Sequence, residues 1–271
     1  MHAPVASLKR RERNATLVGR KRLVSHVVRV EILIALFFVP ATALAGPPFA
    51  TDDPGTLPYL HGEAYLFSSG TRSAGDTALD AAPGVEFNFS FLPDTFAHVD
   101  VPLAYDKPDQ GPAAYGPGDI ELGFKWRFIH QGKYVPDVAT FPFVELPTGD
   151  HSRGLGNGSP QVFLPLWLQK DFGPWTTYGG GGYWINPGPD NRNWWFAGAL
   201  LQRQIFTPLY LGAEIFYTSP QTVDGRPALA FNVGGGVTVI GPYQILFSAG
   251  RNLVNSQDNQ LSYYFALYRT L

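Results

Sequence analysis

Charged side chains recur at every second position in several stretches of the chain. Between Gly116 and His130, the odd positions hold Asp119, Glu121, Lys125 and Arg127, and the even positions hold large apolar residues. Such charges could select ions and orient polar groups in a pore, or they could pair across neighbouring strands as structural salt bridges. Both readings place the charges on one wet face and the apolar residues on the other.

Eight charged residues at such positions are candidate selectivity residues of a lumen: Glu63, Glu86, Asp100, Glu121, Lys125, Arg127, Glu145 and Glu214. The alternative for each is structural pairing, so that no charge is buried alone in a narrow barrel. For Lys125, pairing with an acidic residue such as Glu86 or Glu145 across the lumen is one form that this alternative could take. The histidines are scattered without metal-ligand spacing, so neither a metal nor another cofactor is indicated.

A hydrolase on a barrel wall would need a Ser/His pair, so His61, His98 and His151 are considered. His151 precedes Ser152, but both lie in a glycine-rich predicted loop. No recognisable nucleophile motif surrounds them, and the sequence therefore indicates no enzyme. The glycine run from Tyr178 to Tyr183 lacks the Lys-Ser/Thr of a phosphate loop. Its glycines more simply clear space in a lumen or let a plug approach.

Period-two alternation is the strand period, and it predicts the elements that position these charges. Clusters of Gly, Pro, Asn and Asp separate the alternating stretches as turns. The predicted strands run near 59–68, 84–92, 95–105, 117–129, 137–147, 160–171, 174–185, 193–206, 208–218, 227–239, 242–252 and 260–271. This gives about 12 strands, an even number that suits a bacterial barrel.

Composition decides between a protein core and lipid as the surroundings of the apolar face. Charged residues make up 15 % of the chain and aromatic residues 14 %, whereas soluble domains carry about 25 % charged residues. No segment after residue 45 has 18 consecutive apolar residues, which excludes a spanning helix. A closed transmembrane β-barrel is the other structure that satisfies its backbone hydrogen bonds in lipid. The outer-membrane lipid is therefore an expected partner.

The first 45 residues differ from the rest. Eight basic residues precede the apolar run Ile32–Val39, and Ala43-Leu44-Ala45 follows. This order is typical of a secretory signal peptide cleaved before Gly46. A membrane anchor is the alternative, but eight apolar residues fall well short of the roughly 20 that a spanning helix needs. Without residues 1–45, 12 of the 20 basic and 20 of the 22 acidic residues remain, a net charge of −8 that argues against nucleic acid as a partner.

The segment Gly46–Pro58 has no alternation and is either a periplasmic tail or a plug inside the lumen. Residues 59–271 form the predicted barrel domain. The longer connections at 107–118, 149–159 and 187–192 are expected outside the cell, and the turns at Asp94 and Pro208 at the opposite end. Aromatic residues at predicted strand ends are interpreted as interface girdles: Tyr59, Trp175, Tyr183, Trp184, Trp194, Trp195, Tyr217, Tyr243, Tyr263, Tyr264 and Tyr268.

Two motifs add a resemblance. The stretch Gly116–Phe128, followed by Glu145–Asp150 and Gly154–Gly158, resembles the G-x-G-D…K-[YW]-R-[FL] and P-T-G-D…G-x-G elements of the outer-membrane transporter family linked to the meta-cleavage pathway of phenol degradation. The likeness covers most of the chain after residue 45. It implies an outer-membrane barrel that transports aromatic or other hydrophobic compounds.

The sequence thus predicts an all-β, antiparallel transmembrane barrel in the bacterial outer membrane. Its expected function is a channel or conduit for small hydrophobic or aromatic molecules. The alternatives are a structural barrel with a sealed lumen and, less favoured, an outer-membrane lipid hydrolase. The last strand is rich in aromatics, although Leu271 stands where many such barrels end in Phe. This strand makes the barrel-assembly machinery a further expected partner.

Overall fold

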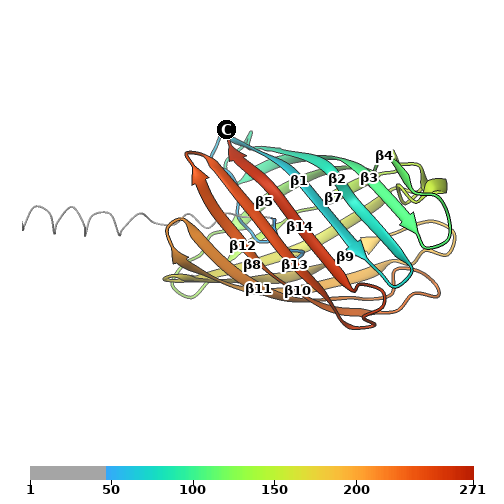
Figure 1. Ribbon diagram of the computed structural model, residues 1–271. Helices are drawn as coiled ribbons and strands as arrows, with labels where there is room; N and C mark the ends of the chain where they lie inside the picture. The colour runs from blue at the N-terminus through green and yellow to red at the C-terminus, as the bar shows by residue number, and fades with distance from the viewer. Residues whose placement is uncertain (1–46) are drawn as a thin grey trace, which may run out of the picture. The chain divides into compact units, whose positions relative to one another are not determined.

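The predicted alternation of apolar and polar residues runs through fourteen β-strands of the computed structural model, which describes residues 47–271 (Figure 1). The strands are β1 (Gly62–Arg72), β2 (Asp76–Phe89), β3 (Thr95–Pro108), β4 (Ala114–Pro117), β5 (Ile120–Ile129), β6 (Asp137–Thr140), β7 (Phe143–Leu146), β8 (Gln161–Phe172), β9 (Trp175–Ile185), β10 (Trp194–Phe206), β11 (Leu209–Thr218), β12 (Ala228–Ile240), β13 (Tyr243–Val254) and β14 (Leu261–Thr270). A short 3-10 turn, η1, spans His151–Arg153. Within residues 47–271, no helix has the length and apolar character needed to cross a membrane. The predicted signal peptide, 1–45, lies outside the described residues.

The fourteen strands make a wall of twelve, as the sequence predicts. Both β4 and β5 pair with β3, and both β6 and β7 pair with β5 and β8 as the two halves of one wall strand. The sequence predicts β6 and β7 as one continuous strand, 137–147. It predicts β5 within a strand at 117–129 but leaves most of β4 in the connection at 107–118. The first break falls at Asp119, whose carboxylate accepts hydrogen bonds from the backbone N–H groups of Gly149 and Asn157. The second falls at Phe141 and Pro142, and proline has no N–H to give to the ladder.

The wall closes because the first strand pairs with the last. β1 and β14 run antiparallel, in a register from Glu63 opposite Thr270 to Arg72 opposite Leu261. Every wall strand therefore has a neighbour on both sides, and the sheet has no free edge. Strand β2 begins at Asp76, earlier than the expected residue 84, because its pairing with β3 continues past an irregularity between Leu79 and Gly84.

The two faces of the wall are those that the alternation predicts. On β5, the side chains of Leu122, Phe124 and Trp126 point outward and are 37–48 % exposed, whereas Lys125 points inward and is 1 % exposed. Large apolar side chains are exposed in the same way on every long strand of the cylinder. An apolar outer face on a closed wall is the arrangement that a lipid bilayer requires.

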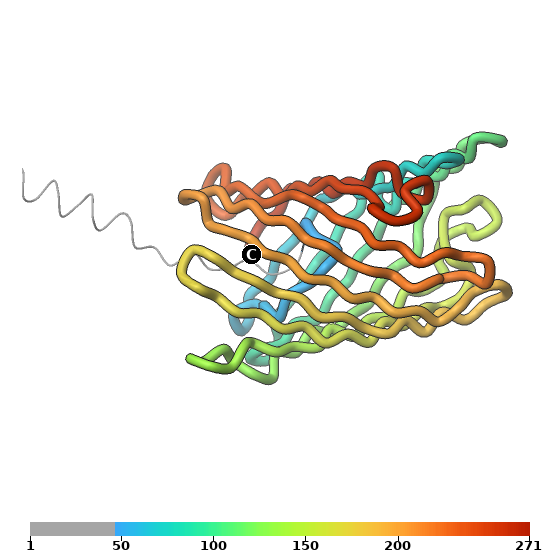
Figure 2. Tube along the Cα trace, turned by 90° about the horizontal axis from the view of Figure 1, so that it is seen from below, coloured from blue at the N-terminus to red at the C-terminus, as the bar shows by residue number. Residues whose placement is uncertain are grey.

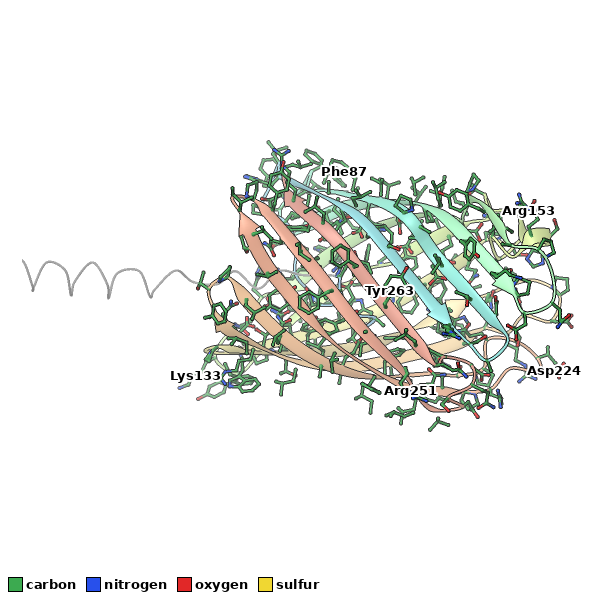
Figure 3. All side chains as sticks on the ribbon, in the orientation of Figure 1. Phe87, Lys133, Arg153, Asp224, Arg251 and Tyr263 are labelled. Carbon is green, nitrogen blue, oxygen red and sulfur yellow. The ribbon has the colours of Figure 1, made fainter. Side chains whose placement is uncertain are left out.

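The two ends of the barrel differ in their loops. The connections after β3, β7 and β9 lie at one end, and the two-residue turns after β10 and β12 lie at the other, because consecutive wall strands alternate in direction. Figure 3 shows Arg153 and Asp224 at the first end and Lys133 at the second. The described N-terminal segment, residues 47–58, runs inside the wall, where it appears in blue in Figure 2.

Candidate functional site

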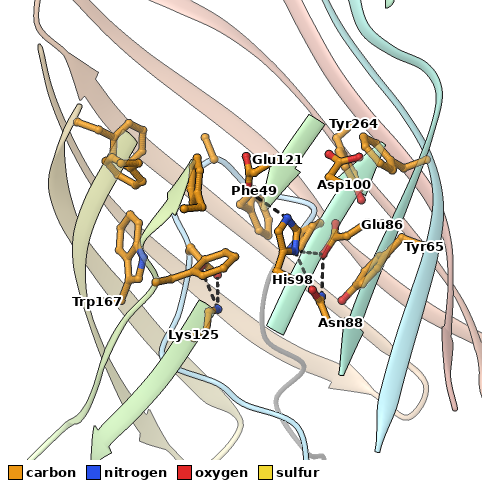
Figure 4. Close-up of a pocket in the computed structure, with 18 of the residues that line it drawn as sticks. Phe49, Tyr65, Glu86, Asn88, His98, Asp100, Glu121, Lys125, Trp167 and Tyr264 are labelled. Atoms are coloured by element: carbon orange, nitrogen blue, oxygen red, sulfur yellow. Dashed lines mark hydrogen bonds and ion pairs between the residues drawn. The ribbon is translucent and has the colours of Figure 1, made fainter. Parts of the chain in front are cut away.

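The main cavity of the lumen has a volume of about 430 Å3. Side chains from β1, β2, β3, β5, β7, β8, β9, β10, β11 and β14 line it, together with Phe141 and residues of the N-terminal segment (Figure 4). Twelve of its lining side chains are aromatic: Phe49, Tyr65, Phe67, Phe96, Phe141, Phe143, Phe163, Trp167, Trp184, Trp194, Phe196 and Tyr264. The cavity therefore offers mainly ring faces and edges, with polar groups at a limited number of places.

Strands β8, β9 and β10 supply one wall of the cavity, a buried cluster that we call the aromatic wall: Phe163, Trp167, Trp184, Trp194 and Phe196. The rings of Trp184 and Trp194 stack at 5.0 Å between centroids with an interplanar angle of 8°. The rings of Phe163 and Trp184 stack at 4.8 Å. Offset stacking of this kind fixes ring orientation beyond what burial alone achieves.

Glycines make room for the aromatic wall, which confirms their predicted role of clearing space in the lumen. A Cβ added at Gly182 would lie 2.5 Å from the Phe163 ring, and one at Gly180 would lie 3.0 Å from the Trp167 ring. Both glycines stand on β9, opposite residues of β8. In the glycine run from Tyr178 to Tyr183, the absence of side chains therefore leaves room for the bulky rings of β8.

A polar cluster faces the cavity from β1, β2, β3 and β5. The side-chain amide of Asn88 donates hydrogen bonds to Glu63 Oε1 at 2.9 Å and to Glu86 Oε1 at 2.8 Å. The ring of His98 lies between two acceptors, with Nδ1 2.7 Å from Asn88 Oδ1 and Nε2 3.0 Å from Glu121 Oε1. Because both ring nitrogens face oxygen atoms, this geometry favours the doubly protonated, cationic imidazolium.

The N-terminal segment is fixed to the inner wall at two charged residues. Lys125 Nζ lies 2.9 Å from Asp52 Oδ2 and donates to the carbonyl oxygen of Asp53 at 3.0 Å. The carboxylate of Glu214 accepts hydrogen bonds from the backbone N–H groups of Ala50 and Thr51, at 2.9 and 2.8 Å. The segment therefore closes one side of the main cavity.

Two further contacts fit the segment to the wall. Ser248 donates its hydroxyl hydrogen to the carbonyl oxygen of Pro48. Gly198 leaves the space that Thr51 occupies, because a Cβ at Gly198 would collide with the Thr51 hydroxyl. Thr51 and Asp53 are 0 % and 1 % exposed. The segment is thus packed as closely as a protein core.

A second cavity of about 400 Å3 lies beside the first, toward the loop that contains η1. The two cavities share Phe67, Asp100 and Glu121, which therefore stand at their junction. Five carboxylate side chains line the second cavity: Asp80, Asp100, Asp119, Glu121 and Glu145. None of its described lining residues is Lys, Arg or His.

The structure distributes the eight candidate selectivity residues over several places. Glu63, Glu86, Asp100, Glu121 and Lys125 line the main cavity, and Glu145 lines the second cavity. Glu214 holds the N-terminal segment. Lys125 does pair with an acidic residue, but that residue is Asp52 and not Glu86 or Glu145, because the N-terminal segment brings the Asp52 carboxylate within reach.

Arg127 lies away from both cavities, at the end of the barrel with the short turns. Its guanidinium donates to Asp94 Oδ1 at 2.8 Å, and His130 Nε2 lies 3.0 Å from Asp94 Oδ2. Partial burial alone would raise the pKa of Asp94, but these two hydrogen bonds outweigh it and lower the pKa below its usual value. Arg127 therefore orders a turn in this structure.

The sequence reading missed most of the aromatic lining and misplaced part of it. Trp184, Trp194 and Tyr268 are expected in an interface girdle, but they point into the lumen and are 9 %, 9 % and 2 % exposed. Trp195, the neighbour of Trp194, points outward and is 59 % exposed. The sequence of β8 does indicate an apolar lumen at this place. The strand carries apolar residues on both faces, whereas a water-filled lumen would need polar residues on the inward face.

The residues considered for a hydrolase do not form a Ser/His pair. The Ser152 hydroxyl donates to Asp150, and His151 contacts the carbonyl oxygen of Gly156. His61 contacts the carbonyl oxygen of Tyr59, and His98 is held in the polar cluster. Among residues 47–271, no serine hydroxyl is hydrogen-bonded to a histidine ring, so the geometry offers no activated serine.

Comparison with known proteins bears on the fold. No protein-family model matches the chain, and no curated protein sequence matches it. The barrel is similar to the crystal structure of the COG4313 outer membrane channel from Pseudomonas putida F1, with a TM-score of 0.69 and 12 % identity over 83 % of this chain and 100 % of that one. A weaker likeness, with a TM-score of 0.45 and 11 % identity, links it to the translocator domain of the autotransporter NalP from Neisseria meningitidis, over 78 % of this chain and 86 % of that one. The closed wall and its apolar outer face, in a fold shared with outer-membrane barrels, place the protein in the bacterial outer membrane.

Proposed function

We propose that the protein is a passive channel through which small hydrophobic or aromatic molecules cross the outer membrane. The observation that carries this proposal is the aromatic lining of the main cavity, in the middle of a membrane-spanning barrel. Apolar cavities of this size, with a few convergent polar groups, are typical binding sites for small molecules. The proposal assigns the protein transport and no catalytic step.

The N-terminal segment acts as a plug in this proposal. If residues 1–45 are removed as a signal peptide, the segment becomes the free start of the mature chain, and it can move without breaking any wall strand. Its attachments to Lys125 and Glu214 involve side chains and a few backbone groups. Passage of a molecule from the main cavity toward the short turns requires this plug to shift.

The inward charges set the preference of the route in this proposal. Glu121 and Asp100 stand where the two cavities meet, so any molecule moving between them passes two carboxylates. Glu145 lies on the approach from the long-loop end, which we assign to the cell exterior. The resemblance of Gly116–Phe128 and Glu145–Asp150 to the phenol-degradation transporter family supports aromatic cargo. Insertion by the barrel-assembly machinery would use the aromatic last strand.

A structural barrel with a sealed lumen is the second candidate. The close packing of Thr51 and Asp53 against the wall favours it, because a plug held in this way blocks the lumen. The two candidates differ in whether the plug moves. Conductance and solute flux therefore separate them.

The test uses purified protein in planar bilayers and in proteoliposomes. A channel gives measurable conductance and carries benzyl alcohol into vesicles, whereas a sealed barrel gives neither. Trp194→Leu removes a ring from the aromatic wall and should weaken binding of benzyl alcohol, measured by quenching of tryptophan fluorescence. Trp195→Leu, on the outward face of the same strand, is the matched control and should leave binding unchanged. Equal effects of the two substitutions would contradict a lumen binding site.

A further inference from the structure

The main cavity carries more negative than positive side chains. Its lining includes five carboxylates, Asp52, Glu63, Glu86, Asp100 and Glu121, against two side chains that can be cationic. Lys125 forms an ion pair with Asp52 of the N-terminal segment, and the ring of His98 lies between Glu86 and Glu121. Among the described residues, the remaining carboxylates, Glu63 and Asp100, form no ion pair with a basic side chain.

Asp100 is the clearest case. Its Oδ1 atom is buried and has no hydrogen-bond partner among the described residues. It lines both cavities, so a molecule that enters the main cavity from the second one passes this carboxylate. A carboxylate oxygen that is buried without a hydrogen-bond partner favours the arrival of a positive group, because charges attract strongly where water is scarce.

The second cavity, from which a molecule would enter the main cavity, is also lined by negatively charged side chains. The second cavity is lined by Asp80, Asp119 and Glu145 in addition to the shared Asp100 and Glu121, without a basic residue among its described lining. A cleft of one sign concentrates solutes of the opposite charge and excludes solutes of its own. Carboxylates and phenolates are therefore disfavoured along this route before they reach the aromatic rings.

An independent observation points to a ligand in the main cavity. Trp167 is 2 % exposed and lines the cavity, yet its indole Nε1–H has no hydrogen-bond partner among the described residues. Figure 4 shows Trp167 on the wall across the cavity from His98. A buried donor without a partner is costly, and an acceptor atom on a bound molecule would satisfy it. The surrounding tryptophan and phenylalanine rings also attract cations through their faces.

We propose that the main cavity selects organic cations, namely molecules in which an ammonium group is joined to an aromatic body. The ammonium group lies against Asp100 and Glu121 at the junction, the body lies on the aromatic wall, and an oxygen on that body accepts the Trp167 N–H. This inference rests on the proposed function, since it names the class of molecule that the same cavity takes.

The test compares three probes of one shape and different charge: benzylamine, benzyl alcohol and benzoate. Binding to the purified protein is measured by tryptophan fluorescence quenching and by calorimetry. Benzylamine should bind at least about tenfold more tightly than benzoate, with benzyl alcohol between them. Asp100→Asn should remove most of the preference for benzylamine over benzoate. Asp224→Asn, an exposed loop change, is the control.

A second pair of probes tests the role of Trp167. 4-Methoxybenzylamine carries an acceptor that 4-ethylbenzylamine lacks, so the wild-type protein should bind the methoxy compound severalfold more tightly. Trp167→Phe keeps a ring but removes the donor, and should abolish this difference. An unchanged difference in Trp167→Phe would overturn the role assigned to the indole N–H.

The outcomes separate this inference from the proposed function. If benzyl alcohol and benzoate bind as tightly as benzylamine, the selection of cations is wrong while an aromatic binding cavity stands. If none of the three probes binds or crosses the membrane, the proposed function fails as well. If Asp100→Asn keeps the preference for benzylamine, Asp100 is not the residue that causes the selection of the cationic probe.

Discussion

The ammonium nitrogen of Lys125 lies 2.9 Å from the carboxylate of Asp52 and joins the wall of the barrel to the segment inside it. Lys125 is on β5, and Asp52 precedes the first strand of the barrel. The Lys125 ammonium also lies 4.9 Å from the centroid of the Phe141 ring, which adds a cation–π contact. This pair is the main charged attachment of the N-terminal segment to β5.

Lys125→Met should release the segment while the wall still assembles. Removal of one partner of a buried ion pair costs about 3–5 kcal/mol, and here a shift of Asp52 toward water relieves that cost. We expect larger conductance in planar bilayers and faster protease cleavage within residues 47–58. Lys133→Met, at an exposed loop lysine, should change neither. Unchanged conductance in Lys125→Met would contradict a movable plug.

Gly198→Ala tests the same segment without altering any charge. An added methyl group at Gly198 would meet Thr51, so the segment must move away from β10. Conductance should rise, and cleavage within residues 47–58 should become faster. Gly75→Ala, where an added Cβ meets nothing within 4 Å, is the matched control. A barrel with wild-type conductance and protection would show that the wall, and not the segment, adjusts.

Phe124→Arg tests the outward face of β5. A guanidinium held in the hydrocarbon near the middle of the bilayer should lower the free energy of unfolding by about 2–4 kcal/mol. The measurement is urea unfolding of the protein folded into lipid vesicles. Leu261→Arg, at the first residue of β14 and thus near a rim, should cost no more than about 1 kcal/mol. Equal costs at the two positions would contradict the assignment of Phe124 to the bilayer interior.

The contacts of Asp94 predict a loss of stability in acid. Because the pKa of Asp94 is lowered in the folded state, its contribution to stability is fully present above the ordinary carboxyl pKa and is lost as the pH falls through the lowered value. The thermal unfolding temperature should therefore depend less on pH in this acidic range for Asp94→Asn than for the wild type. The substitution should also reduce the stability near neutral pH. An identical pH profile in both proteins would contradict the prediction.

The strands and their faces could be predicted because they follow from local periodicity. Phe124 and Lys125 are neighbours with opposite environments, and alternation alone assigns them. The partner of Lys125 could not be predicted in the same way, because Asp52 lies in a segment with no period and the contact depends on how the chain folds back into the lumen. The aromatic wall could not be predicted for another reason. Trp194 and Trp195 are adjacent residues of the same type, so residue type does not tell which of them points into the lumen, and only the register of the strand places them on opposite faces.

The pairing of β1 with β14 also sets an order of events during biogenesis. Among the described strands these two are the farthest apart along the chain, so one edge of β1 stays without its neighbour until β14 has been delivered. Throughout that interval the edge is open to pairing with strands of other molecules.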